Sequence, residues 1–139
     1  MGKFEIIDHT ADLAMKITGD NPVDFFAQAL VGLRALTELD QAVLEERNVV
    51  DEITVYGNDL EEILVHFLNE LVRLIQESEM SPLQLQDLEI FSDHLSCKIL
   101  SKPVIEFPDG YVEIKAATYH MLAINNDAGT LSATVILDI

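Results

Sequence analysis

Basic residues and cysteine are both scarce in this sequence. Of its 139 residues, 8 are Lys or Arg and 25 are Asp or Glu, which gives a formal net charge of -17 with neutral histidines. So acidic a surface repels a phosphate backbone, and the sequence has no basic patch, so we expect no direct nucleic-acid binding. The one cysteine, Cys97, excludes an internal disulfide, a cysteine-based zinc site and a CxxC redox pair, and it favours a reducing compartment.

Long hydrophobic runs and glycine-rich motifs are also missing. A membrane span takes about 20 consecutive apolar residues, and the sequence has no such run. The start, Met1 to Phe4, reaches the acids Glu5 and Asp8 before the apolar core of a signal peptide could form. We therefore expect a cytoplasmic protein with no membrane partner. The glycines stand singly, without a phosphate-binding loop, GxGxxG or GxSxG, which argues against a nucleotide enzyme.

The chain does have enough apolar residues for a core. They make up 49% of the sequence, against 24% charged residues, which excludes disorder of the whole chain and puts the acidic charge on a folded surface. Domains cluster around roughly 100 to 150 residues, so this length suits one core. No repeat, low-complexity tract or linker divides the sequence, and we expect a single domain over residues 1–139.

The first predicted helix runs from about residue 22 to residue 38. Three features mark its start: an N-cap asparagine, a proline at the first helical position and a carboxylate in the first turn, namely Asn21, Pro22 and Asp24. Apolar residues then recur at helical spacing, which gives one side of the helix a stripe to bury.

The second predicted helix has the longest apolar period in the chain. The period extends from Leu60 to Ile75, and the pattern is broken between residues 77 and 82. Asn58 and Glu61 fit a capping box at its start, in which each side chain satisfies a backbone donor. The positions predicted to face outward are Glu62, His66, Asn69 and Arg73.

The other apolar stretches alternate with a period of two, which is typical of strands. Strands are predicted over residues 3–7, 13–18, 49–56, 88–90, 95–99, 111–117 and 131–139. Ser92 and Asp93 form a hairpin turn, and Pro103, Pro108 and Gly110 mark irregular chain. Because the strand-rich second half contains no helix, the pattern favours an α+β fold over a doubly wound one. We expect a mixed β-sheet of about six to eight strands with the two amphipathic helices packed on one face.

Two aspartates stand at strand ends, on the face opposite the apolar residues. Strand parity separates Asp12 from the apolar face that begins at Leu13, and it separates Asp138 from the apolar face of the last strand. The α-carboxylate of Ile139 follows directly. Gathered together, these groups would form a hard oxygen site of the kind that Ca²⁺, Mg²⁺ or Mn²⁺ prefers. The other interpretation is that Asp12 caps a turn and Asp138 is a solvated strand end.

The four histidines are scattered, with neither HExxH nor a pair at helical spacing, so zinc hydrolase chemistry is poorly supported. His66 is interpreted as a solvated helix position. His9 and His120 each lie near acids at a turn or strand end, where a hydrogen-bonded surface role and a place beside a site both fit. Lys115, one of only 8 basic residues, alternates with Glu113 on its strand, and a salt bridge across the sheet would explain it.

Four stretches of the chain, in order, resemble the archease family. They are Asp8 to Asp12 (DHTAD), the helix centre His66 to Glu70 (HFLNE), Ile114 to His120 (IKAATYH) and the chain end Leu137 to Ile139 (LDI). The resemblance covers nearly the whole chain in register. The opening of the first helix, Asn21 to Asp24, and residues 100–110 depart from the family pattern.

The resemblance implies an accessory protein of RNA ligation and not an enzyme. Members of the family assist the RtcB-type ligase that joins tRNA halves, by promoting guanylylation of the ligase and its multiple turnover. On this sequence the family's metal site falls on Asp12, Asp138 and the carboxylate of Ile139, and its ligase-activating lysine falls on Lys115. The implied cofactor is a divalent cation, calcium, magnesium or manganese. A second family role is as a chaperone or specificity factor for a tRNA cytosine-5 methyltransferase.

The resulting hypothesis is a cation held by these three acidic groups and presented, with Lys115 nearby, to the nucleotide site of the ligase. Such a cation would neutralise phosphate charge during transfer. The acidic surface would dock a basic face of the ligase by electrostatic complementarity. Two alternatives stay open. One is the methyltransferase chaperone, which needs no metal, and the other is a stand-alone metal-dependent hydrolase with His9 or His120 as the base.

Overall fold

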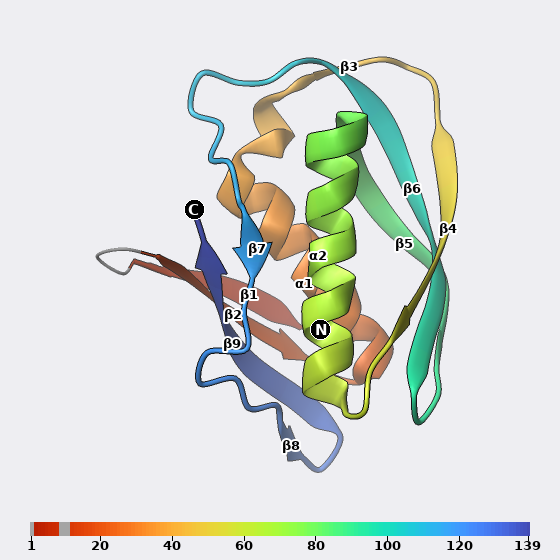
Figure 1. Ribbon diagram of the computed structural model, residues 1–139, viewed down its shortest axis with the longest axis vertical. Coiled ribbons are helices and arrows are strands. Elements are labelled where there is room, and N and C mark those ends of the chain that lie inside the picture. The colour runs from red at the N-terminus through yellow and green to blue at the C-terminus, as the bar shows by residue number, and fades with distance from the viewer. Residues whose placement is uncertain (1, 9–11) are drawn as a thin grey trace.

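The computed structural model describes residues 2–8 and 12–139, and in this part of the chain two α-helices and nine strands form two sheets (Figure 1). The strands are β1 (Lys3–Asp8), β2 (Leu13–Gly19), β3 (Val43–Leu44), β4 (Val49–Tyr56), β5 (Met80–Ile90), β6 (His94–Glu106), β7 (Ala116–Ala117), β8 (Asn125–Asp127) and β9 (Thr130–Asp138). The helices are α1 (Pro22–Thr37) and α2 (Leu60–Ser78), with a short 3-10 helix, η1 (Leu39–Gln41). The predicted α+β class is confirmed.

The two α-helices lie between the two sheets. One sheet has the order β1-β2-β9-β7, with β8 also paired to β9, and the other has the order β3-β6-β4, with β5 paired to β6. Helix α1 contacts β1 and β2 of the first sheet and β5 of the second, while α2 contacts β4, β5 and β7 (Figure 1). The strands therefore form two sheets with only antiparallel pairs, in place of the one mixed sheet that was expected.

Three phenylalanines join the helices at the centre of the core. Phe25 and Phe26 of α1 and Phe67 of α2 are all fully buried. The rings of Phe26 and Phe67 meet edge to face, with centroids 5.3 Å apart, which is a favourable geometry for aromatic pairs. The predicted apolar face of the last strand is also confirmed, since Leu131, Ala133, Val135 and Leu137 are buried. No helix in the described part of the chain is long and apolar enough to cross a membrane.

The predicted cap of the first helix is confirmed, and that of the second is displaced by one residue. Asn21 accepts a hydrogen bond from the backbone N–H of Asp24 at 2.9 Å. At α2 the N-cap is Asp59 and not Asn58, and it accepts from the N–H of Glu62 at 2.8 Å. Glu62 in turn accepts from the N–H of Asn58 at 3.3 Å, so the carboxylates of Asp59 and Glu62 together satisfy two backbone donors at the helix start.

The predicted hairpin is confirmed and is longer than expected, because β5 and β6 extend through two prolines. Pro82 lies in β5, an edge strand, beside a register shift, and Pro103 lies where the neighbour of β6 changes from β4 to β3. Both positions tolerate the loss of a backbone donor, since edges and irregularities are where prolines occur in sheets. The expectation that Pro103 marks irregular chain is therefore wrong.

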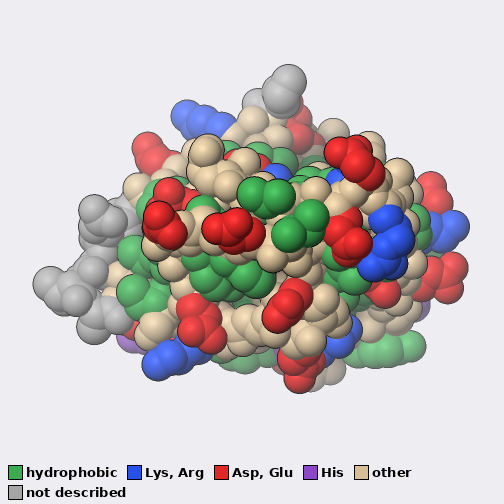
Figure 2. Space-filling view, turned by 90° about the horizontal axis from the view of Figure 1, so that it is seen from above, with side chains coloured by type: hydrophobic (Ala, Val, Ile, Leu, Met, Phe, Trp, Pro, Cys, Tyr) green, Lys and Arg blue, Asp and Glu red, His purple; other side chains and the backbone are tan. Residues whose placement is uncertain are grey.

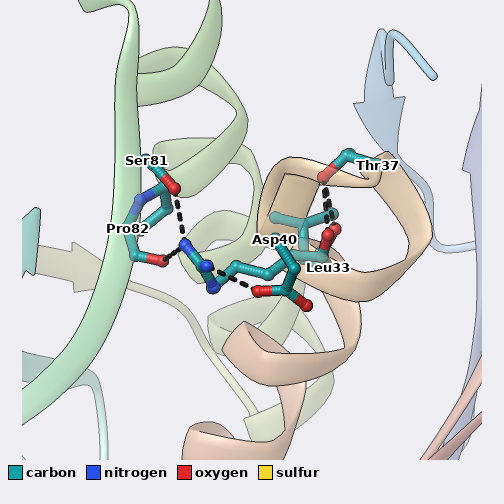
Figure 3. Close-up of polar contacts among 6 residues, drawn as sticks. Leu33, Thr37, Asp40, Ser81 and Pro82 are labelled. Carbon is teal, nitrogen blue, oxygen red and sulfur yellow. Dashed lines mark hydrogen bonds and ion pairs between the residues drawn. The ribbon is translucent and has the colours of Figure 1, made fainter. Parts of the chain in front are cut away.

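A half-buried arginine, Arg34, connects α1 to the second sheet (Figure 3). The Arg34 guanidinium donates to the hydroxyl of Ser81 and, at 3.0 Å, to the carbonyl of Pro82, both in β5. It also forms an ion pair with Asp40, which follows α1. Because a guanidinium has several donors in a fixed geometry, one side chain holds the helix end, η1 and a strand together.

Cys97 is expected to resist alkylation in the folded protein. Its side chain is buried in β6, and this burial raises the pKa of the thiol to about 12. Because the thiolate is the reactive form, we expect iodoacetamide at mildly alkaline pH to label the native protein roughly a thousandfold more slowly than the urea-unfolded chain. Mass spectrometry over time measures both rates. Equal rates in the two states would contradict the buried position of this thiol.

Candidate functional site

The pairing of β2 with β9 brings Asp12 and Asp138 to the same end of the first sheet. Leu13 is paired with Leu137 in this antiparallel register. Asp12 precedes Leu13 and Asp138 follows Leu137, so the two aspartates are neighbours across the strands. Asp138 is exposed and Asp12 half-buried, whereas Leu137 is fully buried. The side chain of Asp138 thus lies on the face that strand parity predicted.

The segment before β7 brings Lys115 to the same place. Ala116 is paired with Asp138, and the N–H of Lys115 donates to the carbonyl of Asp138 at 2.8 Å. The C-terminus lies beside β7 in Figure 1. The Lys115 side chain is exposed, and no ion pair involves it among the described residues, so the expected salt bridge near Glu113 is not found there. The main chain of Lys115 therefore lies beside that of Asp138, and its side chain is exposed.

Two side chains of α2 hold the Lys115 segment from the other side. Asn69 accepts from the N–H of Ala117 at 2.7 Å and donates to its carbonyl at 3.3 Å. Gln76 donates to the carbonyl of Ile114. Ile114 and Ala117 are buried, so the exposed Lys115 lies between two anchored positions. The main chain on which Lys115 stands is thereby fixed by β9, by α2 and by the core.

These contacts explain why the predicted strand over residues 111–117 is mostly wrong. Only Ala116–Ala117 is a strand. Before it, the N–H of Tyr111 donates to the carbonyl of Pro108, and the N–H of Val112 donates to the carbonyl of Thr37 at the end of α1. Side chains of α2 and the end of α1 make hydrogen bonds to the main chain of this segment. The segment therefore needs no neighbouring strand, although its side chains alternate between apolar and polar.

Sequence reasoning missed Asn69, which was placed on the outward face of α2 together with His66. Both side chains are half-buried and hydrogen-bonded. With Arg73 and Gln76 they recur at intervals of three and four residues, which forms a polar stripe beside the apolar one. A polar stripe of this kind can satisfy the main chain of a neighbouring segment, and three of its members do so here.

His66 is not the solvated residue that the sequence suggested. Its Nδ1 lies 2.5 Å from the carbonyl of Tyr56, and its Nε2 lies 2.8 Å from the hydroxyl of Tyr119. A carbonyl only accepts, so Nδ1 donates, and in the neutral ring Nε2 accepts from Tyr119. Burial, together with the charges of Glu62 and Asp59, raises the pKa of the Tyr119 hydroxyl and keeps it a donor. His66 thus connects β4 to the segment that follows Lys115.

His120 lies beside Asp12, as the sequence allowed. Both line a pocket of about 310 Å³ together with Met121, Thr134 and Ile136. His9, the other histidine predicted near the site, lies outside the described residues. One of the two candidate histidines is therefore within the same hollow as a candidate carboxylate.

The donors gathered at this end suit a hard divalent cation. Asp12 and Asp138 supply carboxylate oxygens, and Ile139, 45% exposed, directly follows Asp138. Such donors fit Ca²⁺, Mg²⁺ or Mn²⁺ better than a metal that prefers thiolate or imidazole. In the described part of the chain, no group of three or more His, Cys, Asp or Glu side chains lies close enough together to hold a metal ion. The predicted site thus depends on two side chains and a main-chain carboxylate.

Comparison with known proteins gives one consistent family. The sequence model of the archease protein family (MTH1598/TM1083) matches residues 4–139. A relative from Drosophila melanogaster, named "Protein archease-like", is 32% identical over 145 residues, and the match covers 99% of this chain and 90% of the relative. A protein archease from Methanosarcina mazei is 27% identical over 143 residues, covering 99% of this chain and 96% of its own length.

Solved structures share the fold. The solution structure of Methanobacterium thermoautotrophicum protein 1598 superposes with a TM-score of 0.71 at 26% identity, covering 98% of each chain. The crystal structure of an archease from Thermotoga maritima, described as a "possible chaperone", superposes with a TM-score of 0.64 at 23% identity, covering 97% of this chain and 96% of that one. The arrangement of two helices between two sheets therefore recurs in proteins of distant sequence.

Proposed function

The chain belongs to the archease family, and from this premise we propose that it is an accessory protein that activates an RtcB-type RNA ligase. It acts by promoting guanylylation of the ligase and its multiple turnover, and it is not itself the enzyme. The observation that supports this role is the convergence of Asp12, Asp138 and the exposed Lys115 at one end of the first sheet.

Each of these groups has a part in the proposed activation. The divalent cation would be held by Asp12, Asp138 and the carboxylate at Ile139. When bound, it would neutralise phosphate charge. Lys115 adds a second positive group beside it, on a main chain fixed by Asp138, Asn69 and the buried Ile114. A fixed position matters because phosphoryl and nucleotidyl transfers depend on positioning and electrostatic stabilisation.

The acidic surface suits a basic docking face on the ligase. The chain has 25 acidic and 8 basic residues. Figure 2 shows Asp and Glu side chains spread over the face seen from above, with fewer Lys and Arg side chains among them. Opposite charges on two partners speed their encounter, and the gain is reduced by salt.

Lys115→Ala is expected to lose most of the acceleration of ligase guanylylation. The variant keeps the backbone N–H that donates to Asp138, so the loop should stay in place while the positive charge is removed. Removal of one charge-stabilising group at a transfer centre costs roughly a hundredfold in rate. Single-turnover incorporation of labelled GMP into the cognate ligase, with and without this protein, measures the effect.

Lys3→Ala is the matched control, because Lys3 is an exposed lysine on β1 of the same sheet. It should stimulate as well as the wild type. If both variants stimulate fully, Lys115 has no part in activation. If the wild type itself has no effect on guanylylation, the ligase role is wrong, while membership of the family stands.

A second candidate role is favoured by the Thermotoga maritima relative, which is described as a possible chaperone. For this chain the partner would be a tRNA cytosine-5 methyltransferase, contacted through the surface without a metal. A change in methyltransferase solubility or specificity that is unaffected by EDTA and by Asp138→Asn would support it.

A further inference from the structure

Strand β4 has an edge with no neighbouring strand in the described part of the chain, and on that edge His66 contacts the last carbonyl, that of Tyr56. On its other side β4 is paired with β6. In Figure 1 it forms the open flank of the second sheet. Four of its side chains are exposed, including Val50 at 51% and Tyr56 at 64%. A sheet edge of this kind is a template for pairing with another chain.

The register shows which backbone groups face outward. Gly57 donates to the carbonyl of Asp93, so this pair lies on the hydrogen-bonded side of the ladder. In an antiparallel pair bonded and non-bonded positions alternate, and the β4–β6 register has no bulge. Val50, Glu52 and Thr54 therefore direct their N–H and carbonyl groups away from β6. The carbonyl of Tyr56 points the same way, and there it meets His66.

The other long edge strand of this sheet is protected and β4 is not. Strand β5 contains Pro82 and two register irregularities, devices that block pairing with another chain. Strand β4 contains neither proline nor lysine. Its protection against a second copy is charge alone, since each copy carries a net charge of -17 and the strand itself carries Asp51 and Glu52.

The same charges select a basic occupant. Glu52 is exposed on the outer face of the strand. On the helix side, Glu70 lines a groove of about 300 Å³ together with Val55, Tyr56, His66 and Asn69. Glu70 is itself paired with Arg73, so the acid available on this side is the half-buried Asp51, which strand parity places on the face opposite Glu52. An added strand with alternating basic and apolar side chains would meet acids on both of its faces, whereas an acidic strand would be repelled.

We propose that the free edge of β4 binds an extended basic segment of a partner protein by strand addition. Main-chain hydrogen bonds from Val50, Glu52 and Thr54 supply the pairing, and Asp51 and Glu52 supply the preference for lysine and arginine. The surface belongs to the second sheet, while Asp12, Asp138 and Lys115 gather on the first. The inference therefore does not rest on the ligase role.

The probe is a fluorescent peptide of alternating lysine and valine, as long as β4, with a glutamate–valine peptide as its control. We expect the wild type to bind the lysine peptide, more weakly as salt rises, and not the glutamate peptide. Thr54→Pro removes one outward N–H and leaves the β6 ladder intact, so it should weaken binding about tenfold. Thr54→Val keeps that N–H and should bind like the wild type. Fluorescence anisotropy measures all three proteins.

Equal binding by Thr54→Pro and the wild type would overturn the proposal, because the peptide would then be held by surface charge alone. If Thr54→Pro does not fold, amide hydrogen exchange of the wild type decides. The amides of Val50, Glu52 and Thr54 should gain protection when the peptide is added, and no gain would equally overturn strand addition. Protection of these amides without peptide, in a protein that sediments as a dimer, would assign the edge to a second copy instead.

Discussion

Asp138→Asn is expected to weaken binding of a divalent cation by about tenfold or more, and to abolish stimulation of the ligase with it. Asp138 supplies one of only two side-chain carboxylates at the predicted site, and an amide keeps its shape but loses its charge. The fold should be unchanged, because the side chain is exposed and its structural contact is the main-chain carbonyl that accepts from Lys115. Asp12→Asn should have the same effect.

Calorimetric titration with Mg²⁺, Mn²⁺ and Ca²⁺ measures the affinity, and single-turnover guanylylation measures the stimulation. Asp127→Asn is the matched control, since Asp127 is an exposed aspartate on β8 of the same sheet. Thermal melting in EDTA should give the same midpoint for all variants. If Asp138→Asn stimulates the ligase fully, the bound cation has no part in the proposed function, and docking by surface charge is the part that stands.

The part of the site that could be predicted is the part built from regular strands. Parity alone separates Asp12 from Leu13 and Asp138 from Leu137, because side chains alternate between the two faces of a strand. The pairing of Leu13 with Leu137, which the structure shows, then makes the aspartates neighbours. This adjacency is long-range information, which the resemblance to the archease family implied and which the alternating pattern could not supply.

The position of Lys115 depends on contacts that no local pattern encodes. Alternation predicted a strand here, but Asn69 and Gln76 of α2 take the place of a neighbouring strand. The helix was predicted correctly, yet a helical period shows only which face is apolar, and not which polar side chains bond to another segment. Fixed spacing of polar residues along α2 was the available signal.

The division into two sheets was missed for a related reason. Both sheets have strands that alternate in the same way, so periodicity identifies strands without assigning them to sheets. Helix α1 buries apolar residues against β2 and β5, which belong to different sheets. The apolar face of α1 is therefore broad enough to pack against both sheets, and this breadth allows the second sheet to cover the side of the helices that the first sheet leaves open.

Phe67→Ala is expected to lower the free energy of unfolding by about 3 to 5 kcal/mol, the usual cost of truncating a buried phenylalanine. Phe67 is fully buried and meets Phe26 edge to face, so the substitution leaves a cavity where α1 and α2 join. Phe91→Ala is the matched control. Phe91 is 47% exposed and stacks on His94 at the hairpin turn, so its removal should cost less than about 1 kcal/mol. Urea unfolding followed by circular dichroism compares the two, and equal losses would show that the helices are not joined through this aromatic contact.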